Sequence, residues 1–128
     1  MAKEEAKEWF KRAEKDIEEA EFLFNNNRPL ENVGLFIQQA VEKYLKGFLI
    51  YHGWELRKIH DLISLLGDVI EIDKEFEKFS DALQVITKYY LDSRYPLGYS
   101  LEYTKEDIRE SITSAKAIIS LIKKKLSP

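Results

Sequence analysis

The sequence predicts an all-α protein, an up-and-down bundle of four long helices plus one short helix, in a single domain that spans residues 1–128. Three observations lead to this prediction. Apolar residues recur at three- and four-residue steps over long stretches, which is the helical period. The chain has only five glycines and three prolines, and no segment alternates as a strand would. Its 128 residues are enough to bury about two-thirds of the unfolded surface in one core.

The first helix is expected from Ala2 to Phe24. One apolar stripe runs along it, made of Ala6, Trp9 or Phe10, Ala13, Ile17, Ala20 and Phe24. The segment NNNRP at 25–29 should end it, because asparagines favour turns and the residue before a proline is biased away from the α conformation.

The second helix is expected from Leu30 to His52, with Gly53 as the residue that closes its C-terminus. Residues 33–51 carry three charges, whereas the equally long segment 3–21 carries thirteen. A helix with so few charges must be covered on more than one side, so this should be the central helix of the bundle.

A short helix is expected at about 61–70, with His60 or Asp61 as its N-cap. A long helix should follow, from an N-cap at Asp73 to about Ser93. Its core stripe would be Phe76, Phe79, Leu83, Ile86 and Tyr90.

The last helix should begin at Thr104, where the sequence TKED resembles a capping box with Asp107 in the acidic position. Its inward residues would be Ile108, Ile112, Ala115, Ile118 or Ile119, and Ile122. It ends in three lysines at 123–125, where cations favour the helix dipole.

Composition favours a cytoplasmic protein. The chain has no cysteine, which fits a reducing compartment. No apolar run approaches the roughly 18 residues of a spanning helix, and the first ten residues lack a signal-peptide core. The net charge of −3, with both signs intermixed, gives no basic field for non-specific nucleic-acid binding. Abundant Ile, Glu and Lys, with one Met, also lean towards a heat-loving source.

The sequence lacks the common catalytic motifs and predicts neither a metal nor a cofactor. Its two histidines are His52 and His60, and neither belongs to an H-E-x-x-H or E-x-x-H motif. The glycines are isolated, and none opens a helix as a phosphate-binding loop does.

One face of the second helix is polar. Its residues, spaced as i, i+3, i+4 and i+7, are Gln39, Glu42, Lys43 and Lys46. The simple interpretation is a solvated face on which Glu42 pairs with Lys46, a contact worth about 0.2–0.5 kcal/mol. However, Leu35, Leu49 and Ile50 flank this face, which suggests that another helix or a second subunit covers part of it.

His60 and Asp61 are the second candidate feature. A histidine before a short helix is most often a cap or a packing residue. In a functional interpretation, His60 would hold a phosphate or a backbone group, while Asp61 would orient it or receive an arginine.

Arg94 and Tyr95 are the third candidate feature, and five of the seven tyrosines lie between Tyr89 and Tyr103. Guanidinium binds phosphate or carboxylate with two parallel hydrogen bonds, and a tyrosine ring can stack on a base. Alternatively, Arg94 complements the dipole of the preceding helix while the tyrosines cover the end of the bundle. Spacing alone does not separate the two interpretations.

Several segments in order resemble the HEPN family, the "higher eukaryotes and prokaryotes nucleotide-binding" domains. They are FIQQAVEKYLKGFL at 36–49, KIHDL at 58–62 and SRYP at 93–96, preceded by an A-x-x-W-x-x-x-A-x-x-D pattern at 6–16. The resemblance covers nearly the whole chain. It implies a four- or five-helix bundle like the C-terminal domain of kanamycin nucleotidyltransferase, commonly dimeric.

The resemblance also implies a partner and a set of site residues. Small HEPN proteins are often encoded beside a minimal nucleotidyltransferase, in a two-component or toxin–antitoxin system, and contribute to nucleotide or substrate binding. By this analogy the ligand-binding or interface candidates are Gln39, Glu42, Lys43, Lys46, His60, Asp61, Arg94 and Tyr95.

The chain departs from the family's ribonucleases in one respect. These resemble one another in an R-x4-6-H motif, and neither histidine here follows an arginine at that spacing. The expectation is therefore a non-catalytic homodimer that binds a nucleotide or another phosphorylated ligand beside a nucleotidyltransferase partner. The alternatives are a divergent ribonuclease and a purely structural dimeric interaction module.

Overall fold

The computed structural model describes residues 2–92 and 103–127 and is all-α, as predicted. Its elements are α1 (Ala2–Asn25), α2 (Leu30–Tyr51), α3 (Leu62–Ile72), the 3₁₀ helix η1 (Lys74–Phe79), α4 (Ser80–Asp92) and α5 (Lys105–Leu126). No strand occurs within these residues. Arg94 and Tyr95 lie outside the described residues.

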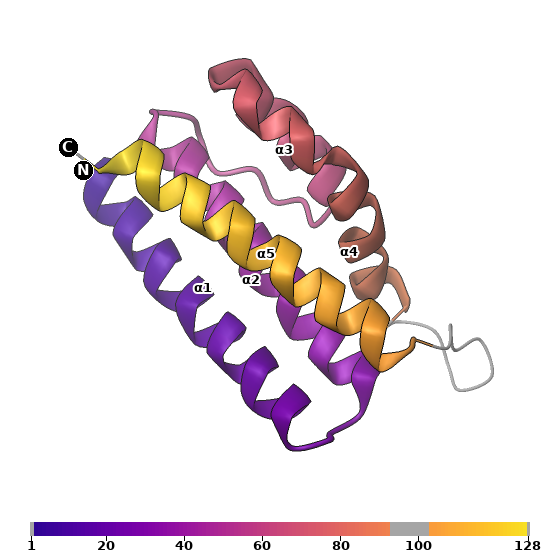
Figure 1. The fold of residues 1–128 in the computed structure, drawn as a ribbon. Coiled ribbons are helices and arrows are strands. Elements are labelled where there is room, and N and C mark those ends of the chain that lie inside the picture. The colour runs from indigo at the N-terminus through magenta and orange to yellow at the C-terminus, as the bar shows by residue number, and fades with distance from the viewer. Residues whose placement is uncertain (1, 93–102, 128) are drawn as a thin grey trace.

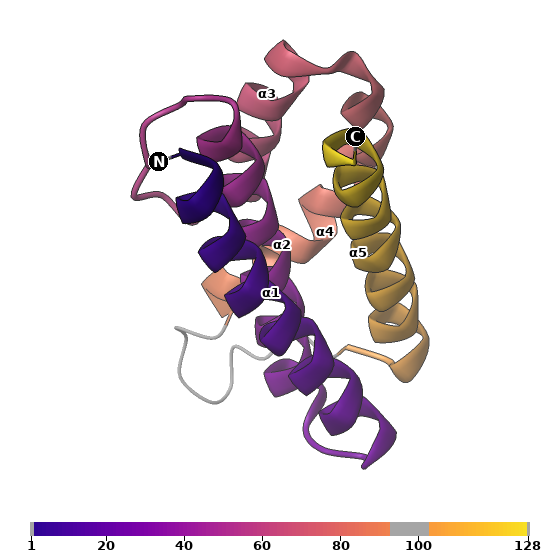
Figure 2. The same ribbon diagram turned by 90° about the vertical axis from the view of Figure 1, so that its left-hand side faces the viewer.

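The central position of α2 is confirmed, because it contacts each of the other four α-helices (Figures 1 and 2). The segment from Val41 to Ile50 is buried at every position except Lys43. The predicted helix end is also confirmed: the backbone N–H of Gly53 bonds to the carbonyl of Ile50 at 2.9 Å, and Gly53 has a φ of +89°. A glycine adopts this left-handed conformation without steric cost.

The α1 and α2 helices lie side by side and antiparallel (Figure 1). Gly47 allows this close approach, because a Cβ there would stand 2.5 Å from the Phe10 ring. Gly34 plays the same part towards α4, since its Cβ would stand 2.9 Å from the Tyr89 ring. Small residues on α2 thus let aromatic rings from two neighbouring helices pack onto its backbone.

The prediction of one continuous helix from Asp73 to Ser93 was wrong in its first part. Residues 74–79 form the 3₁₀ helix η1, and α4 begins only at Ser80. Asp73 is the N-cap as expected, and its side chain accepts from the backbone N–H of Glu75. In a 3₁₀ helix, residues three apart are aligned, so Phe76 and Phe79 both point into the core.

The N-terminal caps of α3 and α5 lie where the sequence placed them. Asp61, one of the two predicted alternatives, caps α3, because its Oδ1 accepts from the N–H of Ile63 at 2.9 Å. Thr104 and Asp107 form the predicted capping box of α5, with both reciprocal bonds at 3.0 Å. Each cap satisfies N–H groups that the helix itself leaves unpaired.

The tyrosines near the end of α4 are partly structural. Tyr89 is 2% exposed, its hydroxyl lies 2.7 Å from the Ser111 hydroxyl on α5, and its ring meets the Tyr103 ring edge to face. Tyr89 therefore joins α2, α4 and α5. No helix among the described residues has both the length and the apolarity to cross a membrane.

Candidate functional site

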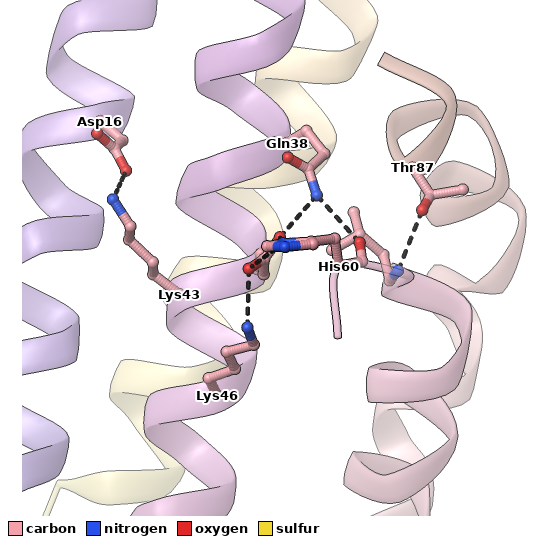
Figure 3. Close-up of polar contacts among 8 residues, drawn as sticks. Asp16, Gln38, Lys43, Lys46, His60 and Thr87 are labelled. Atoms are coloured by element: carbon pink, nitrogen blue, oxygen red, sulfur yellow. Dashed lines mark hydrogen bonds and ion pairs between the residues drawn. The ribbon is translucent and has the colours of Figure 1, made fainter. Parts of the chain in front are cut away.

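The buried carboxylate of Glu42 is the centre of the candidate site. Four side chains form what we call the Glu42 cluster: Gln38, Glu42 and Lys46 from α2, and His60 from the segment before α3. Lys46 Nζ lies 2.9 Å from Glu42 Oε2, and Gln38 Nε2 donates to Glu42 Oε1 at 2.9 Å. His60 Nδ1 lies 3.0 Å and 3.1 Å from the two carboxylate oxygens. Figure 3 shows the three side chains pointing at the same carboxylate.

Burial makes these contacts different from a surface ion pair. The side chains of Lys46 and Glu42 are 6% and 10% exposed. A buried charge is costly unless it is paired and hydrogen-bonded, and here the carboxylate faces a cation, an amide donor and an imidazole. The simple prediction of a solvated Glu42–Lys46 pair is therefore right about the pair and wrong about the solvent.

Gln38 ties the cluster to the backbone before α3. Its side chain is fully buried, and besides Glu42 its Nε2 donates to the main-chain carbonyl of His60 at 3.1 Å. Because both partners are acceptors, the amide nitrogen must face them. The amide oxygen of Gln38 is buried without a partner within the described part of the chain.

His60 has one nitrogen inside the cluster and one outside. Because Nδ1 faces a carboxylate, it is the nitrogen that carries hydrogen, and Nε2 is left to face outward. The ring stacks on Tyr90 of α4, with 4.5 Å between ring centroids and 24° between planes. The side chain is 52% exposed, so a ligand can reach it.

A cavity of about 300 Å³ opens beside this imidazole. It is lined by His60, Asp61, Thr87, Tyr90 and Leu91. The Thr87 hydroxyl accepts from the N–H of Leu62 at 3.1 Å, which attaches the start of α3 to α4 (Figure 3). The cavity thus has an oriented imidazole, an aromatic ring and one carboxylate on its wall.

The structure separates the predicted polar face of α2 into two parts. Lys43 turns towards α1, where its Nζ lies 2.6 Å from Asp16 Oδ2 (Figure 3). Gln39 is half-buried and lies outside the cluster. The expected cover over this face comes from α1 and from the segment before α3, because Trp9 packs over the Lys46 ammonium at 5.8 Å.

Asp61 does not orient His60, as one interpretation proposed. Its carboxylate caps α3 and accepts from the Ser64 hydroxyl at 3.1 Å, while Glu42 takes the orienting role.

Sequence reasoning missed Gln38, Thr87 and Tyr90. Gln38 carried a usable signal, because it stands four residues before Glu42. Thr87 and Tyr90 carried none, since only the folded chain brings α4 beside His60.

Comparisons with known proteins identify the family of the chain. The model of the HEPN domain family matches residues 6–126. The chain belongs to the HEPN family. A relative from Methanocaldococcus jannaschii, named "Putative toxin MJ1304", is 31% identical over 132 aligned positions, which cover 92% of this chain and 86% of the relative. Among solved structures, that of an archaeal HEPN homologue, ST0689, matches with a TM-score of 0.76 and 28% identity over 95% of this chain and 98% of that one.

The chain belongs to the HEPN family but has no R-x4-6-H motif. The HEPN bundle is present along the whole described chain, yet His60 is oriented here by Glu42 from the central helix. Within residues 2–92 and 103–127, no three acidic or histidine side chains converge as metal ligands would. The contacts that the structure gives for the site are hydrogen bonds, an ion pair and ring stacking.

Proposed function

We propose that this HEPN protein is one member of a toxin–antitoxin type pair, acts as a homodimer, and has a small nucleotidyltransferase as its partner. The toxin designation of the M. jannaschii relative supports the first part. The partner and the dimer are inferred from the family resemblance of the sequence. Purification of a tagged chain from its native cells, with identification of the proteins that accompany it, tests the partnership: a small nucleotidyltransferase among them is expected. Light scattering tests the dimer.

Within this role, the site at His60 binds a nucleotide or a related phosphorylated ligand without cleaving it. The observation that carries this proposal is the oriented imidazole: Nδ1 is held at 3.0 Å from Glu42, and His60 lines a cavity of about 300 Å³. A phosphate oxygen can accept from Nε2–H of the imidazolium, as in other charge-assisted hydrogen bonds. Tyr90 also lines this cavity, and an aromatic ring can stack on a base.

Calorimetric titration of ATP and GTP tests this site. His60→Ala should weaken binding about 10- to 100-fold, because a hydrogen bond to a charged group is worth roughly 1.5–3 kcal/mol. Asp61→Asn is the matched control variant on the same wall. Asparagine also caps helices well, so α3 should persist while a carboxylate that repels phosphate is lost, and binding should strengthen. Nucleotide binding that is absent, or unchanged in His60→Ala, would contradict the proposal.

A divergent ribonuclease is the second candidate, and one observation favours it. A carboxylate that orients a histidine is the arrangement used for general acid–base catalysis. The absent R-x4-6-H motif favours binding over cleavage, since no arginine at family spacing is available to stabilise the RNA backbone. Incubation with end-labelled RNA separates the two: cleavage by the parent protein that disappears in His60→Ala would replace the binding proposal.

The third possibility, a structural interaction module, is the least supported by the contacts. Lys43, one of the interface candidates, is already held by Asp16 within the chain at 2.6 Å. Lys43→Glu would break this intrachain contact, so loss of dimerisation in that variant would not by itself identify a dimer interface.

A further inference from the structure

A second concave site is lined by residues of α1, α2 and α5, at the end of the bundle where both termini lie (Figure 1). We call it the terminal pocket. It opens between α1 and α5, has α2 as its floor, and has a volume of about 530 Å³. This is within the range of about 300–1,000 Å³ that is typical of small-molecule sites.

Long side chains join α5 to α1. Arg109 lies over the Phe24 ring at 5.5 Å, and Lys116 Nζ lies 3.0 Å from Glu21 Oε2. Lys123 continues this seven-residue spacing and reaches Glu14, with 3.7 Å between Nζ and Oε2. The α1 and α5 ribbons are set apart in Figure 2, and these side chains bridge them.

The floor of the pocket is aromatic and aliphatic. The Phe10 ring stacks on the Tyr44 ring, with 5.6 Å between centroids, and Ile122 closes the side towards α5. The Tyr44 hydroxyl donates to Glu14 at 2.5 Å. Burial, and then this hydrogen bond, raise the pKa of Tyr44 above its ordinary value of 10.0. The hydroxyl is thus already satisfied, and the ring presents only apolar surface to the pocket.

The rim of the pocket is cationic. All charged residues that line it are lysines, namely Lys3, Lys7 and Lys123, although the whole chain has a net charge of −3. Lys3 Nζ lies 5.4 Å from the centroid of the Tyr51 ring, which also lines the pocket. Lys123 shares its charge with Glu14. Lys7 has no ion pair within the described residues, so its charge is available to a ligand.

We propose that the terminal pocket binds an amphipathic organic anion, with its apolar or aromatic body on the Phe10–Tyr44 floor and its acidic group at Lys3 and Lys7. Charge complementarity selects this occupant. A neutral apolar ligand would leave Lys7 without an ion pair, and a free inorganic anion would leave the aromatic floor uncovered. This site shares none of the lining residues of the His60 cavity, so each can fail while the other holds.

Fluorescence titration of the intact protein with anilinonaphthalene sulfonate tests the proposal, because this probe joins an aromatic body to one anionic group. Saturable binding at one site per chain is expected. Lys7→Glu should weaken it about tenfold, because it replaces an attractive contact by a repulsive one. The matched control is Lys88→Glu, the same charge reversal at an exposed position on α4, which should leave the affinity within about twofold.

Two comparisons make the result decisive. N-phenylnaphthylamine has the same aromatic body without the sulfonate and should bind the parent protein more weakly than the anionic probe. Its binding should also be insensitive to Lys7→Glu. The proposal is overturned if the anionic probe does not saturate, if the two probes bind alike, or if Lys7→Glu and Lys88→Glu weaken binding equally. Lys3 and Lys7 are exposed, so these variants should fold.

Discussion

Glu42 shows how one residue connects the stability of the bundle with its candidate site. Its carboxylate accepts from Gln38 and Lys46 and meets His60, and these contacts hold the imidazole against Tyr90. The same contacts let the lysine remain buried at 6% exposure. The orientation of the exposed His60 is therefore set by a carboxylate that a ligand does not need to touch.

Replacement of Glu42 by glutamine should be strongly destabilising. The Lys46 ammonium would stay buried without a carboxylate, and breaking a buried ion pair in this way typically costs about 3–5 kcal/mol. Urea denaturation followed by circular dichroism measures the change. Removal of both charges in Glu42→Gln/Lys46→Met should recover much of the loss, whereas Glu19→Gln, at an exposed position of α1, should change stability by less than about 0.5 kcal/mol. A double variant as unstable as Glu42→Gln would show that the ion pair is not the cause.

At this scale the sequence predicted the residue types of the site better than their partners. Glu42 and Lys46 were identified because polar residues on a helix with few charges are conspicuous. His60 was identified because it directly precedes a short helix. The predicted face included Gln39 and not Gln38, which stands four residues before Glu42 and donates to its carboxylate. The link from Glu42 to His60 spans 18 residues, and no local pattern encodes it.

The elements were predictable where local chemistry decides them. The caps at Asp61, Asp73 and Thr104, and the left-handed Gly53, are properties of a few adjacent residues. The 3₁₀ helix η1 was missed because Phe76 and Phe79 fit an α-helical stripe and a 3₁₀ stripe equally well. Only the folded core, in which both rings are buried, distinguishes the two conformations.

Substitutions at two glycines test the effect of helix packing separately from that of helix propensity. Gly47→Ala should destabilise the protein by about 1–3 kcal/mol, because its Cβ would overlap the Phe10 ring and force α1 away from α2. Gly67→Ala should instead stabilise it by about 0.5–1 kcal/mol, since a Cβ there meets no heavy atom within 4 Å and alanine favours the helix. Thermal unfolding of both variants measures the contrast, and shifts in the same direction would refute the packing argument at Gly47.

At the scale of the whole molecule, the all-α fold class and the central position of α2 could be predicted from the sequence. The spacing of α1 and α5 could not. Charge count was enough to place α2 at the centre. The contacts between α1 and α5 come instead from long side chains, such as Lys116, which reaches Glu21 across 95 residues of chain. Such contacts are a product of the fold, so the terminal pocket left no pattern in the sequence.

The C-terminal end of α5 is attached to the N-terminus of η1 by a single lysine. Lys125 Nζ lies 2.8 Å from Asp73 Oδ2 and 2.8 Å from Glu75 Oε1. The hydrogen bond from Lys125 is the largest influence that lowers the pKa of Asp73 from 3.8, and also the largest that lowers the pKa of Glu75 from 4.5. A carboxyl whose pKa is lower in the folded state stabilises the fold above its unfolded pKa, and this contribution is lost as the pH falls through the folded value.

The stabilisation by Lys125 should therefore depend on pH in the acid range. At pH 7 both carboxylates are charged, and Lys125→Ala should lower the melting temperature. As the pH falls below 4.5 and then 3.8, the parent protein should lose this stabilisation, and the two melting temperatures should converge once both carboxyls are protonated. Thermal unfolding by circular dichroism between pH 7 and pH 2 measures the difference.

The control is Lys124→Ala, at the adjacent exposed position, which should show a small difference in melting temperature that does not change with pH. A difference for Lys125→Ala that stays constant with pH would mean that Lys125 does not act through Asp73 and Glu75.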